Sequence, residues 1–210
     1  MLVEIWSDVV CPWCYIGKRR FETALERFDG RDEVEIVFRP FQLDPGAPPV
    51  ASPVIDAYAR KFGGPDRAIA IIGQLTDLAE KEGLDFRLDE AQRVNTIDAH
   101  RLVEFARAEG RANELYERLL AAYFTEGRDL GDHATLATLA GEAGLDPEAA
   151  AAYLASDAGY AEVRHGLARA AELDIHAVPT FVIDGAWPIP GAQDPDTFLK
   201  VLEKRAAAHD

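Results

Sequence analysis

The spacing of apolar positions predicts three elements at the start of the chain. Leu2–Trp6 is a short apolar run bounded by turn-forming residues, which is typical of a strand. Pro12–Phe28 repeats apolar residues at close to helical spacing. Glu33–Phe38 alternates and is rich in β-branched residues, as a second strand should be. A strand, a helix and a strand in this order predict a right-handed crossover between parallel strands.

A different pattern occupies the middle of the chain. Residues 43–52 are dense in Pro and Gly, which indicates a connection leaving the first unit. From about Pro53 to Leu173 the apolar spacing is helical and is interrupted repeatedly by glycines. This stretch has room for about five to seven helices. Asp146 before Pro147 is a strong opening for one of them, since it joins an N-cap residue to a first-turn proline.

The C-terminal part returns to β structure. Residues 177–183 form a β-rich run, Asp184-Gly185 is a hairpin signal, and Ala186–Ile189 is a second extended piece. Asp194 opens a last helix over 197–207. The order β-α-β, helical block, β-β-α predicts an α/β protein with a thioredoxin fold interrupted by a large all-helical insertion. We expect residues 1–45 plus 175–210 to form the thioredoxin-like domain and residues 46–174 to form the insertion, whose surfaces could support a homodimer.

Composition and charge narrow the possible partners. With 48% apolar residues the chain can bury a substantial core. The 22 basic and 37 acidic side chains give a net charge of -15, which disfavours binding to nucleic acid or to an anionic membrane. The start of the chain has no basic, signal-like segment, and no apolar run is long enough to span a bilayer. We therefore expect a cytoplasmic protein with no nucleic-acid or membrane partner.

Both cysteines of the chain lie in one tetrapeptide, Cys11-Pro12-Trp13-Cys14, between the first strand and the first helix. Two thiols separated by two residues at such a turn are typical of dithiol–disulfide exchange. Structural disulfides are uncommon in the cytoplasm, which favours a catalytic pair. A zinc site needs about four ligands, and the five histidines show no paired spacing, so we expect no metal. Two buried structural thiols remain an alternative, against which Pro12 and Trp13 argue.

The turn also assigns different roles to the two sulfurs. Cys11 is expected at the helix N-cap, Pro12 at the first helical position and Cys14 one turn on. The free N–H groups and the dipole of the helix end favour a thiolate at Cys11, which would point outward and attack. Cys14 would be covered and would resolve the mixed disulfide. Trp13 could offer an exposed apolar platform to a substrate.

Val178-Pro179 is the second candidate element. A proline that opens a strand is either an ordinary trans residue or a cis-proline, and the cysteine pair favours the cis form. Facing Cys11, it would leave the Val178 backbone free to pair with an extended substrate. Asp8 could accept a proton near the thiols or simply cap a turn, and His176 could approach the site or take no part. Lys18-Arg19-Arg20 is expected to be a solvated face.

These residues resemble a known family. Residues 7–17 are similar to the opening of the DsbA-like thioredoxin superfamily, in particular its cytoplasmic FrnE-type branch, and residues 38–43, 95–102, 178–181 and 190–193 resemble later landmarks of that branch. The resemblance implies thiol–disulfide oxidoreductase or isomerase activity, with Cys11 as nucleophile, Cys14 as resolving thiol and Pro179 as the cis-proline. Pro12, Trp13 and Val178 would contact the substrate, and Asn95 and His100 would belong to the groove.

Relatives among the kappa-class glutathione transferases and the 2-hydroxychromene-2-carboxylate isomerases share this architecture but carry serine at the position of Cys11. The leading prediction is therefore a dithiol–disulfide oxidoreductase that acts on protein or peptide disulfides and small thiols. It would need no cofactor beyond its own cysteine pair, with glutathione as a possible co-substrate. The alternative is a glutathione-dependent transferase or small-molecule isomerase, which needs one sulfur only. A chaperone without thiol chemistry is a third hypothesis.

Overall fold

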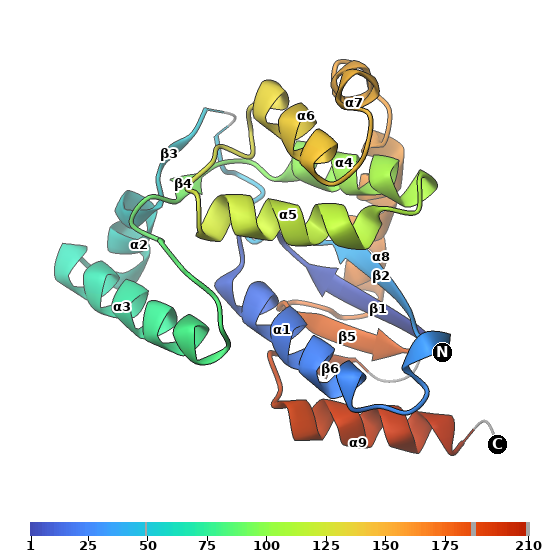
Figure 1. Cartoon of the computed structure of the whole chain (residues 1–210). Helices are drawn as coiled ribbons and strands as arrows, with labels where there is room; N and C mark the ends of the chain where they lie inside the picture. The colour runs from blue at the N-terminus through green and yellow to red at the C-terminus, as the bar shows by residue number, and fades with distance from the viewer. Residues whose placement is uncertain (49, 186–187, 209–210) are drawn as a thin grey trace.

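The computed structural model describes residues 1–48, 50–185 and 188–208. Its main sheet has the strand order β2-β1-β5-β6. Strand β1 (Leu2–Ser7) is parallel to β2 (Glu35–Pro40) and antiparallel to β5 (Thr180–Ile183), so both ends of the chain build one sheet (Figure 1). The predicted crossover and the return of the C-terminal part are confirmed. The predicted extended piece from residue 186 begins outside the described residues, and β6 is Ile189–Pro190.

Helices cover both faces of this sheet. Helices α1 (Pro12–Glu26) and α9 (Pro195–Ala206) pack together on one face (Figure 1). Side chains alternate along β1, so Ile5 belongs to the main core while Trp6 packs on the other face in a smaller cluster with Ala170 of α8. The sheet is thus the middle layer of the fold, and β1 is buried on both of its faces.

The predicted helical insertion is present between β2 and β5, and the described part of it contains seven helices. Asp146 caps its helix with its side chain as predicted, accepting hydrogen bonds from two backbone N–H groups. The strands β3 and β4 form an antiparallel pair of two residues each, which is too short to show a period in the sequence. The elements of this region are α2 (Val54–Phe62), α3 (Pro65–Lys81), α4 (Ile97–Ala108), α5 (Ala112–Phe124), α6 (His133–Glu142), α7 (Pro147–Leu154), α8 (Tyr160–Glu172), β3 (Ser52–Pro53) and β4 (Gln92–Arg93).

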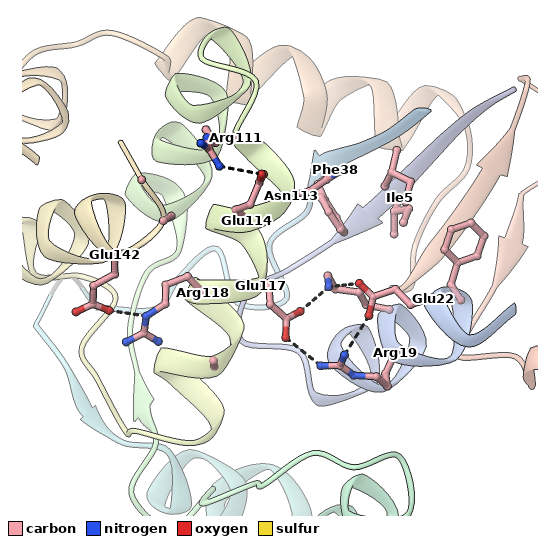
Figure 2. A pocket seen from close by; sticks show the side chains of 16 residues that line it. Ile5, Arg19, Glu22, Phe38, Arg111, Asn113, Glu114, Glu117, Arg118 and Glu142 are labelled. Carbon is pink, nitrogen blue, oxygen red and sulfur yellow. Dashed lines mark hydrogen bonds and ion pairs between the residues drawn. The ribbon is translucent and has the colours of Figure 1, made fainter. Parts of the chain in front are cut away.

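Helix α5 joins the insertion to the sheet and to α1. The Tyr116 ring of α5 stacks on Phe38 of β2 with centroids 3.9 Å apart. Lys18 of α1 was expected in solvent, but its side chain is only 8% exposed and donates to Glu22 and to Glu117 of α5. Arg19 also pairs with Glu117, as Figure 2 shows. The basic run of α1 is thus an attachment point for the insertion, which a one-helix pattern could not reveal.

Candidate active site

The two cysteines occupy the first turn of α1. Cys11 is the N-cap residue with an extended backbone, and Pro12 is the first helical residue. The backbone N–H of Cys14 donates to the Cys11 carbonyl over 3.0 Å, and the backbone N–H of Cys11 donates to the Asp8 carbonyl. Both cysteines are free thiols. The predicted placement of the pair is confirmed, and it puts the Cys11 sulfur at the positive end of the helix dipole.

The C-terminal part of the chain reaches the Cys11 sulfur. The Val178–Pro179 peptide bond is cis, as predicted. The Cys11 thiol donates to the Val178 carbonyl oxygen, with Sγ and oxygen 3.7 Å apart. Cys11 and Val178 are 167 residues apart in the sequence and are in direct contact in the fold.

Gly17 allows this contact to be close. A Cβ atom at position 17 would lie 2.9 Å from Cγ of Pro179 and 3.3 Å from Cβ of Ala192. Any larger residue would have to push the proline loop away from α1, because carbon atoms do not approach so closely. Glycine on the second turn of α1 therefore sets the position of Pro179 relative to Cys11.

A cavity of about 580 Å³ opens beside Cys11, between the cysteine turn and helices α2 and α3 of the insertion. Cys11 was expected to point outward, but it is only 2% exposed, because the insertion covers the turn. Cys11 nevertheless lines the cavity, together with Trp13, Val178 and Tyr58. Trp13 is 45% exposed, in line with the expected platform. Access to Cys11 is therefore through this cavity.

The insertion supplies polar groups to the cavity that sequence reasoning missed. Tyr58, Lys61 and Arg93 line it, and Arg93 pairs with Asp44. Burial and the charge of Cys11 raise the pKa of Tyr58 to about 12, so its hydroxyl stays protonated near neutral pH and faces the same space as the sulfur. The spacing of Val54, Tyr58 and Lys61 along α2 could have revealed a shared face, but nothing in the sequence said that this face meets Cys11.

Cys14 is 1% exposed and is not among the residues that line the cavity. Burial raises its pKa well above the ordinary value, and the hydrogen bond and charge of Cys11 act in the same direction. Hydrogen bonds from the Ser7 side chain and the Asp8 backbone act in the opposite direction. Cys14 is therefore a protonated thiol at rest, with donors already placed around its sulfur.

Comparisons with known proteins agree with this geometry. A family model described as "DSBA-like thioredoxin domain" matches residues 2–203. The chain belongs to the DsbA-like thioredoxin family. It is 33% identical to the uncharacterised protein YwbO of Bacillus subtilis, over 95% of this chain and 94% of that protein.

Solved structures extend the family match. The chain is 40% identical to a probable DsbA oxidoreductase from Streptomyces coelicolor, with a TM-score of 0.92 over 99% of this chain and 90% of that one. It shares the fold of DsbM, a cytosolic disulfide reductase from Pseudomonas aeruginosa, at 18% identity and a TM-score of 0.68, over 99% of this chain and 100% of that one. In broad terms, these matches indicate a DsbA-like thiol–disulfide oxidoreductase.

Asp8, Asn95 and His100 lie together at the connection that follows β2 in this DsbA-like fold. The Asp8 carboxylate accepts from the Leu43 backbone N–H over 2.8 Å, and His100 Nε2 lies 3.3 Å from its other oxygen and 2.9 Å from the Phe41 carbonyl oxygen. Asn95 accepts from Gln42 and donates to backbone carbonyls of the same connection. None of the three is among the residues that line the Cys11 cavity. Their observed contacts hold the chain segment that passes beside it.

His176 and a second cavity lie apart from the sulfurs. His176 is exposed and pairs with Asp174 over 2.7 Å. A cavity of about 770 Å³ between α1, α5 and the sheet, drawn in Figure 2, is lined by neither cysteine. Among the residues that the structure describes, no three His, Cys, Asp or Glu side chains are grouped to hold a metal ion, and no helix is long and apolar enough to cross a membrane.

Proposed function

We propose that this protein is a dithiol–disulfide oxidoreductase that exchanges disulfides with protein, peptide or small-thiol substrates through Cys11 and Cys14. One observation carries the proposal. The Cys11 sulfur stands at the N-terminus of α1, 3.7 Å from the Val178 carbonyl oxygen, beside a cavity large enough for a substrate segment. The position places the sulfur at a helix N-terminus, beside a backbone that an extended substrate can pair with.

Reduction of a substrate disulfide takes two steps. The Cys11 thiolate attacks one sulfur of the substrate disulfide, forms a mixed disulfide and releases the other substrate sulfur as a thiolate. Cys14 then loses its proton to solvent and attacks the Cys11 sulfur. This second step forms the Cys11–Cys14 disulfide and releases the remaining substrate thiolate, so two electrons pass from the protein to the substrate. Oxidation of a substrate dithiol is the reverse sequence.

The other predicted site residues receive supporting roles in this proposal. Pro12, Trp13 and Val178 border the approach to Cys11, so they contact the substrate there. Pro179 holds the Val178 carbonyl against the sulfur. Asn95 and His100 do not contact the substrate. They hold the connection of residues 41–48, whose Leu43 and Asp44 line the cavity.

The test is turnover of insulin disulfides by the single-cysteine variants. Cys11→Ser should lose activity by about a thousandfold or more, because no other sulfur faces the cavity. Cys14→Ser should also fail to turn over, while forming a stable mixed disulfide that mass spectrometry detects. Full turnover by Cys14→Ser would contradict the proposal.

A glutathione-dependent transferase or isomerase is the second candidate function. The cavity carries Lys61, whose charge suits a carboxylate of glutathione, and Arg93, which is already paired with Asp44. DsbM from Pseudomonas aeruginosa, whose fold this chain shares, has also been solved with GSH. This function needs Cys11 alone, so Cys14→Ser would retain it. Glutathione could equally be a co-substrate of the dithiol reaction, in which case both sulfurs are required.

We place the protein in the cytoplasm. Its two cysteines are both used in the redox motif, which leaves none for the structural disulfides that are common in oxidising compartments. Alkylation of the protein in rapidly quenched cells, which reports whether Cys11 and Cys14 are reduced, tests this assignment.

A further inference from the structure

Two buried hydroxyl groups are hydrogen-bonded to each other next to Cys14. Ser7 closes strand β1, and Tyr116 comes from α5 of the insertion. The Tyr116 hydroxyl and Ser7 Oγ are 2.6 Å apart, and both side chains are inaccessible to solvent. Ser7 also lies next to Cys14, and its hydroxyl lowers the pKa of that thiol against the effect of burial. Nothing in the reaction written above uses either hydroxyl.

The direction of these bonds follows from the number of protons available. Burial and the charge of Cys14 raise the pKa of Tyr116 well above its ordinary range, so this phenol is protonated in the folded protein near neutral pH. Among the described residues, Ser7 is the one hydrogen-bond partner of the Tyr116 hydroxyl. A phenol buried in this way has to donate to Ser7, since an unused donor would be costly. The single proton of the Ser7 hydroxyl is then left to point at the sulfur.

We propose that Ser7 and Tyr116 are positioning residues for the resolving step: Tyr116 fixes the orientation of the Ser7 hydroxyl, and Ser7 donates a hydrogen bond to the Cys14 thiolate as it forms. This inference rests on the proposed dithiol function and deepens it. A thiolate that forms in a dry core needs donors that are already oriented, because no water can reorganise around it. The insertion thus contributes to the chemistry on the core side of the turn as well as to the cavity.

Other titratable groups surround Cys14 and have to be kept constant in any test. They are Cys11 on the same helix, and Asp8 on the preceding turn with His100 against its carboxylate. Tyr116→Phe leaves all three in place and keeps the ring that stacks on Phe38. It removes only the hydroxyl that orients Ser7, so a change in the pH dependence of resolution would belong to the hydroxyl chain.

The experiment is stopped-flow release of thionitrobenzoate from 5,5′-dithiobis(2-nitrobenzoate) by the reduced full-length protein. In the first phase, Cys11 attacks the reagent, forms a mixed disulfide and releases one thionitrobenzoate. In the second phase, the Cys14 thiolate attacks the Cys11 sulfur, its proton goes to the buffer, and the second thionitrobenzoate leaves. The two phases separate attack from resolution within one trace.

Tyr116→Phe and Ser7→Ala should slow the second phase about tenfold at neutral pH and move its pH midpoint up by about one unit, since each weakens a hydrogen bond to a charged group. The first phase should keep its rate. The double variant should resolve no more slowly than Ser7→Ala, because the two hydroxyls act as one unit. Tyr15→Phe is the matched control, since it deletes a buried hydroxyl that bonds to Glu117 over 2.8 Å, and it should leave both phases unchanged.

Three results would overturn the inference while leaving the dithiol function intact. They are an unchanged second phase in both single variants, equal slowing of both phases, and additive losses in the double variant. Failure of the function itself looks different. In that case Cys11→Ser would still release thionitrobenzoate in the first phase, or the parent protein would release one equivalent and no second.

Discussion

The two cysteines of the turn are separated by only two residues in sequence but lie in different surroundings. Cys11 faces a cavity that holds aromatic, basic and backbone groups and leads to solvent. Cys14 is buried in the core, where the Ser7 side chain and the Asp8 backbone lower its pKa against the effect of burial. The cavity side suits recognition of many partners, whereas the core side is built for one internal reaction. One helix end thus holds two buried cysteines of which only Cys11 lines the cavity.

Gly17→Ala tests the cavity side of the turn, and we expect it to change the rate of the reaction more than the other variants discussed below. The added methyl group would meet Pro179 at 2.9 Å and displace the Val178 carbonyl from the Cys11 sulfur. A shift of a few tenths of an ångström should slow attack by Cys11 about tenfold. The measurement is the first phase of thionitrobenzoate release, and the resolving phase should change less.

Gly166→Ala is the matched control for this variant. A Cβ atom there would lie 2.5 Å from Cγ of Pro40, so it crowds a proline from a helix in the same way, but at the end of β2, on the other side of β1 from the Val178–Pro179 segment. Both variants should lose about 1–3 kcal/mol of unfolding free energy in urea, and only Gly17→Ala should slow attack. Equal attack rates in the two variants would show that the Gly17 contact does not position the proline loop.

Alkaline unfolding compares the two sides through their tyrosines. Tyr58 on the cavity side and Tyr116 on the core side both have a pKa raised in the folded state, mainly by burial. The folded protein holds these protons more tightly than the unfolded chain, so stability is intact below about pH 10 and falls as pH rises. Each tyrosine should contribute about 1.4 kcal/mol per pH unit to that loss.

The measurement is the urea midpoint at about pH 9, 10 and 11 for the parent protein, Tyr58→Phe and Tyr116→Phe. Each variant should lose stability less steeply above about pH 10 than the parent does. If Tyr58→Phe lost stability with pH as steeply as the parent protein, the Tyr58 hydroxyl would be in contact with solvent. Only the core side would then hold a tyrosine whose pKa is raised by burial.

Tyr58→Phe should have the smallest effect on the reaction itself. Tyr58 lines the same cavity as Cys11 and is close enough for the two charges to interact, so loss of its hydroxyl should slow attack on a small disulfide about threefold. The resolving phase should keep its rate, because Cys14 lies on the other side of the turn. A slower second phase with an unchanged first phase would contradict the separation of the two regions.

The sequence predicted the elements whose signal is local. A period of apolar residues or a capping residue marks each of these elements in the sequence: strand β1, helix α1, the parallel strand β2, and the helices capped by Asp146 and Asp194. The cysteine turn and the cis Val178–Pro179 bond could be predicted because their residue types are unusual and specific. The division into residues 1–45 plus 175–210 and 46–174 stays a prediction, and so do the FrnE-type branch and the homodimer.

The sequence could not predict contacts made by ordinary residues across long separations. Tyr116 is one tyrosine among six, and its bond to Ser7 spans 109 residues. Lys18 has the pattern of a solvated residue and is buried only because α5 brings Glu117 to it. Cys11 could be placed at the helix end, but its burial depends on how α2 and α3 fold over it.

The bond between Ser7 and Tyr116 has a consequence for how such proteins can diverge or be redesigned. Replacing Ser7 alone strands a phenolic proton in the core, which costs about 1–3 kcal/mol, whereas replacing both partners avoids that cost. The two positions are therefore expected to be exchanged together, although one belongs to the sheet and the other to the inserted helices. A transplant of the tetrapeptide onto another scaffold would carry over the thiols and leave this partnership behind.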